Sequence, residues 1–411
     1  MKPVPWKTIA PVLAGMAGLA WLLLKFPSSS LSPAAAATRE TIPAANSIVP
    51  SNAVDATRSG AIRPSRRSSD SPSKEGRLQE IQNALVRLRA GAEAAASRNL
   101  LDELQQRLVG GDSRAEAVEV IQEFLRLGED AKTGLGFRVG PHHALRDAPT
   151  LRTALLDWLG ELDRAAAGRQ ATEILEAMLS PDEVAIALRN FAWGFPGERE
   201  QLAVYFTRLL HRADWAEQPS GGYLESFDLV PYLGNPAFVK SVGPFLSPTS
   251  TPEVRNASLV ALDRLVLANP AGTIADIVER QALADQPLVR ATFLARADPR
   301  DTRQRALLER YLLSVPISAA EFAKFIRVFP NGNRNVSHNL LTDSAAPMLA
   351  DLAAIDRSAL ELVRAWAADP RFAAHTLDLA QLRNRLEEQA ASAARGGYLP
   401  QAATTTTRST N

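Results

Sequence analysis

The chain contains no cysteine in its 411 residues. This absence excludes disulfides, thiolate metal sites, iron–sulfur clusters, a cysteine nucleophile and an anchor built on a lipid-modified cysteine. A cysteine-free chain is compatible with an oxidising compartment but does not establish one. Covalent cross-links therefore contribute nothing to this fold, which must be stabilised by packing, hydrogen bonds and ion pairs.

Histidine is also scarce, and the common catalytic motifs are missing. The five histidines form no HExxH motif and no pair at i, i+4, so a helical zinc site is not expected. No Walker loop, no GxGxxG opening a helix and no GxSxG elbow occurs. The triplet 132–134 (KTG) and the segment 71–74 (SPSK) imitate serine-acylase motifs, but no strand is evident around the first and the second lies in a disordered-looking linker. We assign no catalytic, cofactor-binding or metal-binding residue, expect no cofactor, and predict a protein that is not an enzyme.

Residues 78–400, the main part of the chain, carry no excess of positive charge. Formal net charge is +1 overall, but residues 39–77 hold seven Lys/Arg against four Asp/Glu, whereas residues 78–400 hold 35 against 41. The segment from 78 to 400 is therefore mildly acidic. A nucleic-acid-binding protein normally carries a basic surface, so we expect no nucleic-acid partner.

One long hydrophobic run is present, at residues 8–24, directly after Lys2 and Lys7. Its 17 uncharged residues reach the short end of the length range for a transmembrane helix. Trp6 and Trp21 lie near its two ends, where indole rings favour the membrane interface.

Two interpretations of this run remain open. It is either a cleaved secretory signal, with the alanines at 34–37 as cleavage site, or an uncleaved signal anchor. We favour the anchor, because the run exceeds a typical signal core and Lys25 separates it from the alanines. Residues 1–26 are thus predicted to cross the inner (plasma) membrane once, with the rest of the chain on the extracytoplasmic side.

Residues 27–77 are rich in Ser, Ala, Pro and Arg and poor in large apolar residues. Such a composition cannot bury enough apolar surface to offset the entropy of ordering, so we predict a disordered linker. Residues 401–411 are predicted to be a disordered tail for the same reason.

Residues 78–400 show helical periodicity and almost no strand alternation. Leu151, Leu155, Trp158, Leu159 and Leu162 fall on one helical face and predict a buried stripe. The expected helices cover residues 78–88, 100–109, 114–127, 151–162, 171–179, 182–193, 198–212, 223–232, 236–246, 253–268, 272–284, 288–297, 301–313, 319–328, 345–352, 358–368 and 377–394.

A weak internal repeat runs through this body. The pattern Pro, any residue, aliphatic, Arg opens expected helices at residues 149–152, 252–255 and 287–290. The intervals are close to 35 residues or a multiple of 34, which is typical of helix pairs that stack on one another. Segment 251–266 resembles the first helix of a HEAT-type repeat, and the resemblance extends over about residues 149–313. It implies an irregular right-handed α-solenoid of stacked helix pairs that binds a protein partner.

Two stretches interrupt the helical pattern. Residues 128–149 form the longest irregular segment, and a binding loop carrying Lys132, Arg138, His142 and Arg146 is one interpretation. The alternative is a crossover that packs Leu135, Phe137 and Val139 onto the helices. Residues 330–344 contain four asparagines, which favour turns.

Three classes of function follow from these features. The leading hypothesis is a non-enzymatic scaffold or adaptor, tethered to the membrane and binding a protein partner outside the cytoplasm. The second is a membrane-anchored steric chaperone, similar in plan to lipase-specific foldases, whose signature is only faintly matched at residues 226–229 (SFDL). The third is an enzyme with an unrecognised carboxylate site in a helical cleft.

Overall fold

The computed structural model describes residues 73–110, 113–313, 317–334 and 336–394. These residues form a mostly helical body of many packed helices, which confirms the predicted all-α class and is compatible with a helical-repeat fold. The predicted anchor at 8–24, nearly all of the linker and the tail at 401–411 lie outside the described residues. Within the described residues, no helix combines the length and the apolar character needed to cross a membrane.

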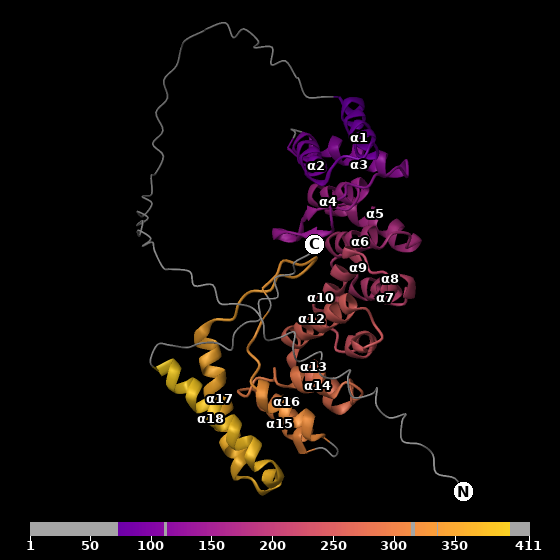
Figure 1. The fold of residues 1–411 in the computed structure, drawn as a ribbon. Helices are drawn as coiled ribbons and strands as arrows, with labels where there is room; N and C mark the ends of the chain where they lie inside the picture. The colour runs from indigo at the N-terminus through magenta and orange to yellow at the C-terminus, as the bar shows by residue number, and fades with distance from the viewer. Residues whose placement is uncertain (1–72, 111–112, 314–316, 335, 395–411) are drawn as a thin grey trace, which may run out of the picture. The chain divides into compact units, whose positions relative to one another are not determined.

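Most elements follow one another along the chain with short connections, and the longest connections join α3 to β1 and α16 to α17 (Figure 1). They are α1 (Lys74–Arg89), α2 (Ala94–Val109), α3 (Arg114–Arg126), β1 (Arg138–Val139), η1 (Pro141–His143), β2 (Leu145–Asp147), α4 (Leu151–Leu162), α5 (Arg164–Ala177), α6 (Pro181–Gly194), α7 (Arg199–Leu210), α8 (Ala213–Glu217), α9 (Gly221–Glu225), η2 (Ser226–Asp228), α10 (Leu229–Leu233), α11 (Phe238–Val242), η3 (Gly243–Leu246), α12 (Pro252–Ala268), α13 (Pro270–Glu279), α14 (Pro287–Leu294), α15 (Thr302–Leu313), α16 (Ala319–Val328), α17 (Leu349–Ala368), η4 (Pro370–His375) and α18 (Thr376–Ala394).

The helices pack as pairs in two layers. The first helices of successive pairs contact one another: α4 packs on α6, α6 on α9, α10 on α12 and α14 on α16. The second helices do the same, with α7 against α11, α11 against α13 and α13 against α15. The last two long helices, α17 and α18, pack on each other, and α18 contacts α16. Because one helix pair cannot cover its own apolar face, each pair depends on its neighbours for a core.

Ion pairs between neighbouring helix pairs recur at a nearly constant sequence separation. Arg–carboxylate partners stand 31 to 33 residues apart in the sequence, close to the predicted period. They are Arg152–Glu183, Arg189–Asp157, Arg208–Glu176, Arg290–Glu321, Arg296–Asp263 and Arg310–Glu279.

The Pro-x-aliphatic-Arg pattern acquires a structural meaning at two of its three sites. Arg152 of α4 forms two hydrogen bonds with Glu183 in the first turn of α6. Arg290 of α14 forms the same two bonds with Glu321 in the first turn of α16. Both glutamates follow a serine N-cap by three residues, and that serine accepts the glutamate N–H. At the third site the arginine instead donates to the carbonyl oxygens at positions 248 and 250.

Helix α4 has the predicted bounds and the predicted buried stripe. The Thr150 side chain caps its N-terminus by accepting the N–H of Thr153. Leu155, Trp158 and Leu159 are all buried in the core. Trp158 is therefore a packing residue, as the helical spacing indicated.

Several predicted helices were wrong in extent. The segments 345–352 and 358–368 are one continuous helix, α17, which starts at Leu349, because no proline or glycine interrupts residues 349–368. The segments 223–232 and 236–246 are instead broken into α9, η2, α10, α11 and η3, since Gly234 turns left-handed (φ 65°) and prolines at 231 and 244 lack an amide donor. Helix α1 also starts within the predicted linker, where Ser73 caps it and Arg77 is buried.

The expectation of almost no strands is confirmed for the described residues, whose one sheet is a short ribbon. Residues 138–139 and 145–147 pair as a short antiparallel ribbon, β1 with β2, inside the long irregular segment. Phe137 is buried, and Leu135 and Val139 pack against the core, as the crossover interpretation predicted. Gly221 makes this packing possible, because a Cβ there would lie 2.7 Å from the Cβ of Phe137.

Candidate functional site

The described part of the segment between α16 and α17, residues 330–334 and 336–348, leaves the helical stack and lies along the layer of first helices. We call it the strap. Figure 1 shows it as an extended orange trace that rises from α16 to the level of α10 and α12 and then returns to α17. A backbone pairing of Ser337 with Ser344 closes the far end of the strap into a hairpin. The hairpin residues Asn339, Leu340 and Leu341 are buried.

Asp228 holds the tip of this hairpin. One carboxylate oxygen accepts the backbone N–H groups of Leu341 and Thr342 at 2.6 and 2.8 Å. The other accepts the Thr342 hydroxyl at 2.5 Å. A single side chain thus satisfies three consecutive donors of an extended segment more than 110 residues away in the sequence.

Arg264 on α12 completes this recognition from the other side. Its Nη1 lies 2.8 Å from the Asp228 carboxylate, and its Nη2 donates to the Thr342 carbonyl oxygen at 3.1 Å. Both side chains are more than 90% buried, so neither charge is held by water. A buried Asp–Arg pair is stable only when further hydrogen bonds satisfy its remaining donors and acceptors, and here the strap supplies them.

The root of the strap is fixed by a second charged pair. The Asn331 N–H donates to the Ala295 carbonyl oxygen at 2.7 Å, and Arg296 Nη1 donates to the Asn331 carbonyl oxygen at 3.1 Å. Arg296 in turn forms an ion pair with Asp263 of α12, with one bond of 2.7 Å. Burial raises the pKa of Asp263 above its ordinary value, even though Arg296 and Arg264 both favour the charged carboxylate.

The hairpin also contacts the loop that precedes α4. His143 Nδ1 lies 2.8 Å from the Asn339 carbonyl oxygen. That loop is held by the fully buried pair of Asp157 and Arg189: Asp157 accepts the Leu145 N–H, and Arg189 donates to the His143 carbonyl oxygen at 2.7 Å. The two irregular stretches of the sequence therefore meet at His143 and Asn339.

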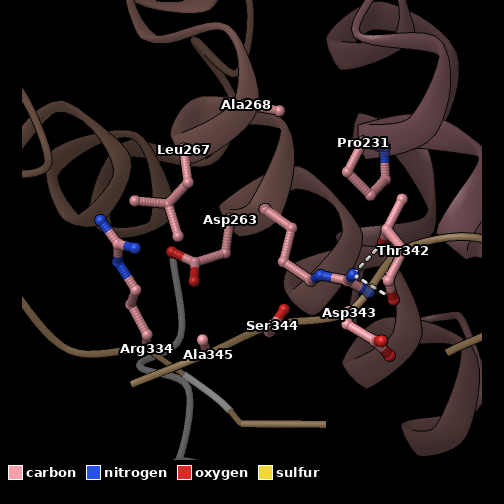
Figure 2. Close-up of a pocket in the computed structure, with 10 residues that line it drawn as sticks. Pro231, Asp263, Leu267, Ala268, Arg334, Thr342, Asp343, Ser344 and Ala345 are labelled. Atoms are coloured by element: carbon pink, nitrogen blue, oxygen red, sulfur yellow. Dashed lines mark hydrogen bonds between the residues drawn. The ribbon is translucent and has the colours of Figure 1, made fainter. Parts of the chain in front are cut away.

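A pocket of about 220 Å³ opens beside the hairpin (Figure 2). Its wall includes Asp263 and Arg264 from α12, Arg334 from the strap, and Thr342 and Ser344 from the hairpin. Figure 2 shows the Arg334 side chain across the pocket from Thr342, with Asp263 between them. The pocket is lined by charged side chains of both signs together with apolar ones, and it lies next to the strap, so the strap does not fill all of the space along this face.

A larger and more apolar pocket, of about 550 Å³, lies between η3 and the connection from α13 to α14. Leu283 and Gln281 there adopt left-handed backbone conformations, which are rare for such side chains. Lys240 and Asp285 lie among its lining residues. No other feature of the described residues identifies what this pocket would bind.

The residues of the predicted binding loop do not converge on one point. Lys132 stands at the root of the ribbon, where its backbone pairs with Thr150. Arg138 lies 3.8 Å from the carboxylate of Asp147 across the ribbon, and His142 lies at its turn. Arg146 is exposed on β2. The prediction that this loop binds a partner stays a prediction, while its neighbour His143 contacts the strap.

Asp228 and Arg264 were not predicted as site residues, although each left a trace in the sequence. Arg264 falls seven residues after Ala257 and ten after Val254, so it lies on the buried stripe of α12, where an unpaired cation would be costly. Asp228 is likewise a charged residue among buried apolar ones, since it stands between Phe227 and Leu229. A charge on a buried stripe indicates a partner, but only the fold shows which one.

Within the described residues, no group of three or more His, Asp or Glu side chains is placed to hold a metal ion. Comparison with known proteins finds no matching family model, no similar curated protein and no similar solved structure.

Proposed function

We propose that this protein is a membrane-tethered helical-repeat scaffold or adaptor that binds a protein partner outside the cytoplasm. One observation carries the proposal: the layer of first helices seats an extended polypeptide segment, the strap, through the buried Asp228 and Arg264. A surface that recognises backbone N–H and carbonyl groups of an extended chain is suited to binding proteins.

The finer architecture belongs to the same proposal. A HEAT-like, right-handed α-solenoid is supported by the repeated Pro-x-aliphatic-Arg helix starts and by ion pairs at separations of 31 to 33 residues. Stacked repeats of this kind present long continuous faces, and such faces serve partner binding.

The tether is supported by the sequence alone, through the uncharged run 8–24 and the Ser/Ala/Pro-rich residues 27–77. Fractionation of the full chain tests it. We expect the protein to stay with membranes in high salt and in carbonate. A soluble product that begins near residue 38 would show that the run is a cleaved signal.

Site-directed photo-cross-linking in the full chain tests partner binding. A photoreactive residue replaces Arg334, which is exposed on the strap beside the pocket, and in a matched control it replaces Val204, which is exposed on α7 of the second layer. We expect a discrete protein adduct from position 334 and not from 204. Identical adducts at both positions, or none at 334, would contradict a binding role for the first-helix face.

A further inference from the structure

The contacts between the strap and the first helices have the character of a ligand bound to a receptor. The face contributes two buried charged side chains, Asp228 of the short helix η2 and Arg264 of the long helix α12. The strap contributes mainly backbone: two N–H groups, one carbonyl oxygen and the Thr342 hydroxyl. Any extended segment with the same short sequence could offer the same groups.

We propose that this face is a binding site for an extended peptide segment of a partner protein, and that the hairpin of the strap occupies it in cis as a displaceable competitor. The inference rests on the proposed scaffold function and names what that scaffold recognises. The partner segment carries two aliphatic residues followed by Thr or Ser and then an acid, the chemistry of residues 340–343 (LLTD).

The specificity follows from burial and hydrogen bonding. Leu340 is fully buried and Leu341 nearly so, which requires aliphatic side chains at these two positions. The Thr342 hydroxyl donates a hydrogen bond to the buried carboxylate of Asp228. A residue without a hydroxyl would remove that hydrogen bond, which is costly for a buried charge. The next residue, Asp343, is exposed and lies 3.2 Å from His338 and 4.0 Å from His143.

Features on both sides of the hairpin indicate that it can leave. Val336 and Met348 are large apolar residues with 69% and 76% of their surface exposed, so they contribute little packing to the seated state. The pocket of about 220 Å³ beside Thr342 and Ser344 remains unfilled. A longer partner segment could place a side chain there and gain contacts that the strap lacks.

Because the strap is part of the same chain, it competes at a high effective concentration, of the order of millimolar for a short flexible connection. A peptide of the same sequence added in solution should therefore bind the native protein weakly. Undocking the strap should make the face accessible to the added peptide and so strengthen its binding.

The test uses the full chain in detergent and a fluorescein-labelled peptide of residues 336–345 (VSHNLLTDSA), with binding measured by fluorescence anisotropy. In a strap-release variant, Leu340→Asp with Leu341→Asp, buried charge disfavours docking of the strap and leaves the face intact. We expect this variant to bind the peptide at least about tenfold more tightly than the native chain. Adding Asp228→Asn to it should weaken binding by about tenfold.

The absence of cysteine permits a second measurement that does not depend on folding of the release variant. Cysteines replace His143 and Asp343, whose side chains approach to 4.0 Å, and a short thiol-specific cross-linker joins them. Cross-linking should abolish residual peptide binding compared with the same variant before reaction.

Three results would each overturn the inference. The first is no peptide binding by a folded release variant, the second is equal binding with and without the Asp228→Asn change, and the third is equal binding before and after cross-linking. A specific protein adduct from position 334 combined with any of these results would leave the scaffold function standing and remove only the peptide site.

Discussion

At the scale of single residues, buried charges define this molecule. Arg189 and Asp157 are almost completely inaccessible, and their ion pair joins α4 to α6 and holds the loop before α4. Gly160 allows this arrangement, because a Cβ at that position would lie 2.4 Å from the Asn190 side-chain oxygen that accepts from Arg189. Removing one member of such a pair leaves an uncompensated charge in the core.

We therefore expect Asp157→Asn to lower the free energy of unfolding by about 3–5 kcal/mol. Urea denaturation followed by circular dichroism measures the change. The matched control is Glu387→Gln, which breaks the exposed pair of Arg364 and Glu387 and should cost no more than about 1 kcal/mol. Equal effects of the two substitutions would show that Asp157 is not an essential partner of Arg189.

Tyr223 supports a prediction about pH. Its side chain is fully buried, its hydroxyl has no hydrogen-bond partner in the described residues, and burial raises its pKa to about 12. The folded state thus binds the phenolic proton more tightly than the unfolded state, in which tyrosine ionises near 10. The associated stability is present below pH 10 and is lost as pH rises toward 12.

Tyr223→Phe should accordingly match the native chain at pH 8 to within about 1 kcal/mol, because it removes an unsatisfied polar group. Between pH 10 and 12 the native chain should lose stability relative to the variant. Urea midpoints of both proteins at pH 8 and pH 11 provide the measurement. A variant that loses as much stability as the native chain at pH 11 would contradict burial of a neutral phenol.

At the scale of elements, the sequence predicted α4 completely and other helices less well. The stripe of Leu155, Trp158 and Leu159 and the cap at Thr150 are local signals, and local signals determine where a strongly amphipathic helix begins and ends. Helix α5 starts at Arg164, earlier than expected, because Asp163 caps it. Its first turns are alanine-rich, so they carried no amphipathic pattern.

Trp158→Ala should lower stability by about 3–5 kcal/mol, since truncation of a buried tryptophan leaves a cavity. In a stack with nearest-neighbour coupling, the loss should fall on α4 and the helices that pack on it. Thermal melts should show a lower midpoint and a broader or split transition, with α12 to α16 still protected in hydrogen exchange. An unchanged melt would refute the assignment of Trp158 to the core.

At the scale of the whole described body, the strap departs from nearest-neighbour coupling. It links the ends of α14 and α16 to Asp228 and to His143, across sequence separations of up to 196 residues. A repeat array without such a segment unfolds unit by unit, because each unit contacts only its neighbours. The strap should therefore make distant units more cooperative.

Leu340→Ala tests this coupling, because Leu340 is fully buried at the tip of the strap. We expect a loss of about 2–5 kcal/mol. Hydrogen exchange should rise both around His143 and in α12, in contrast to the confined effect of Trp158→Ala. Met348→Ala, at an exposed position of the same segment, should change stability by no more than about 0.5 kcal/mol. Faster exchange restricted to the strap itself would argue against long-range coupling.

The sequence by itself determined the helical class, most helix positions and the approximate repeat length, because periodicity and capping act over a few residues. It also marked residues 128–149 and 330–344 as unusual. Only the tertiary structure decided that these two stretches meet at His143 and Asn339 and that Asp228 receives Thr342. Such pairings depend on how the helix pairs stack. A local sequence pattern does not indicate which distant backbone groups will form hydrogen bonds with a buried charged side chain.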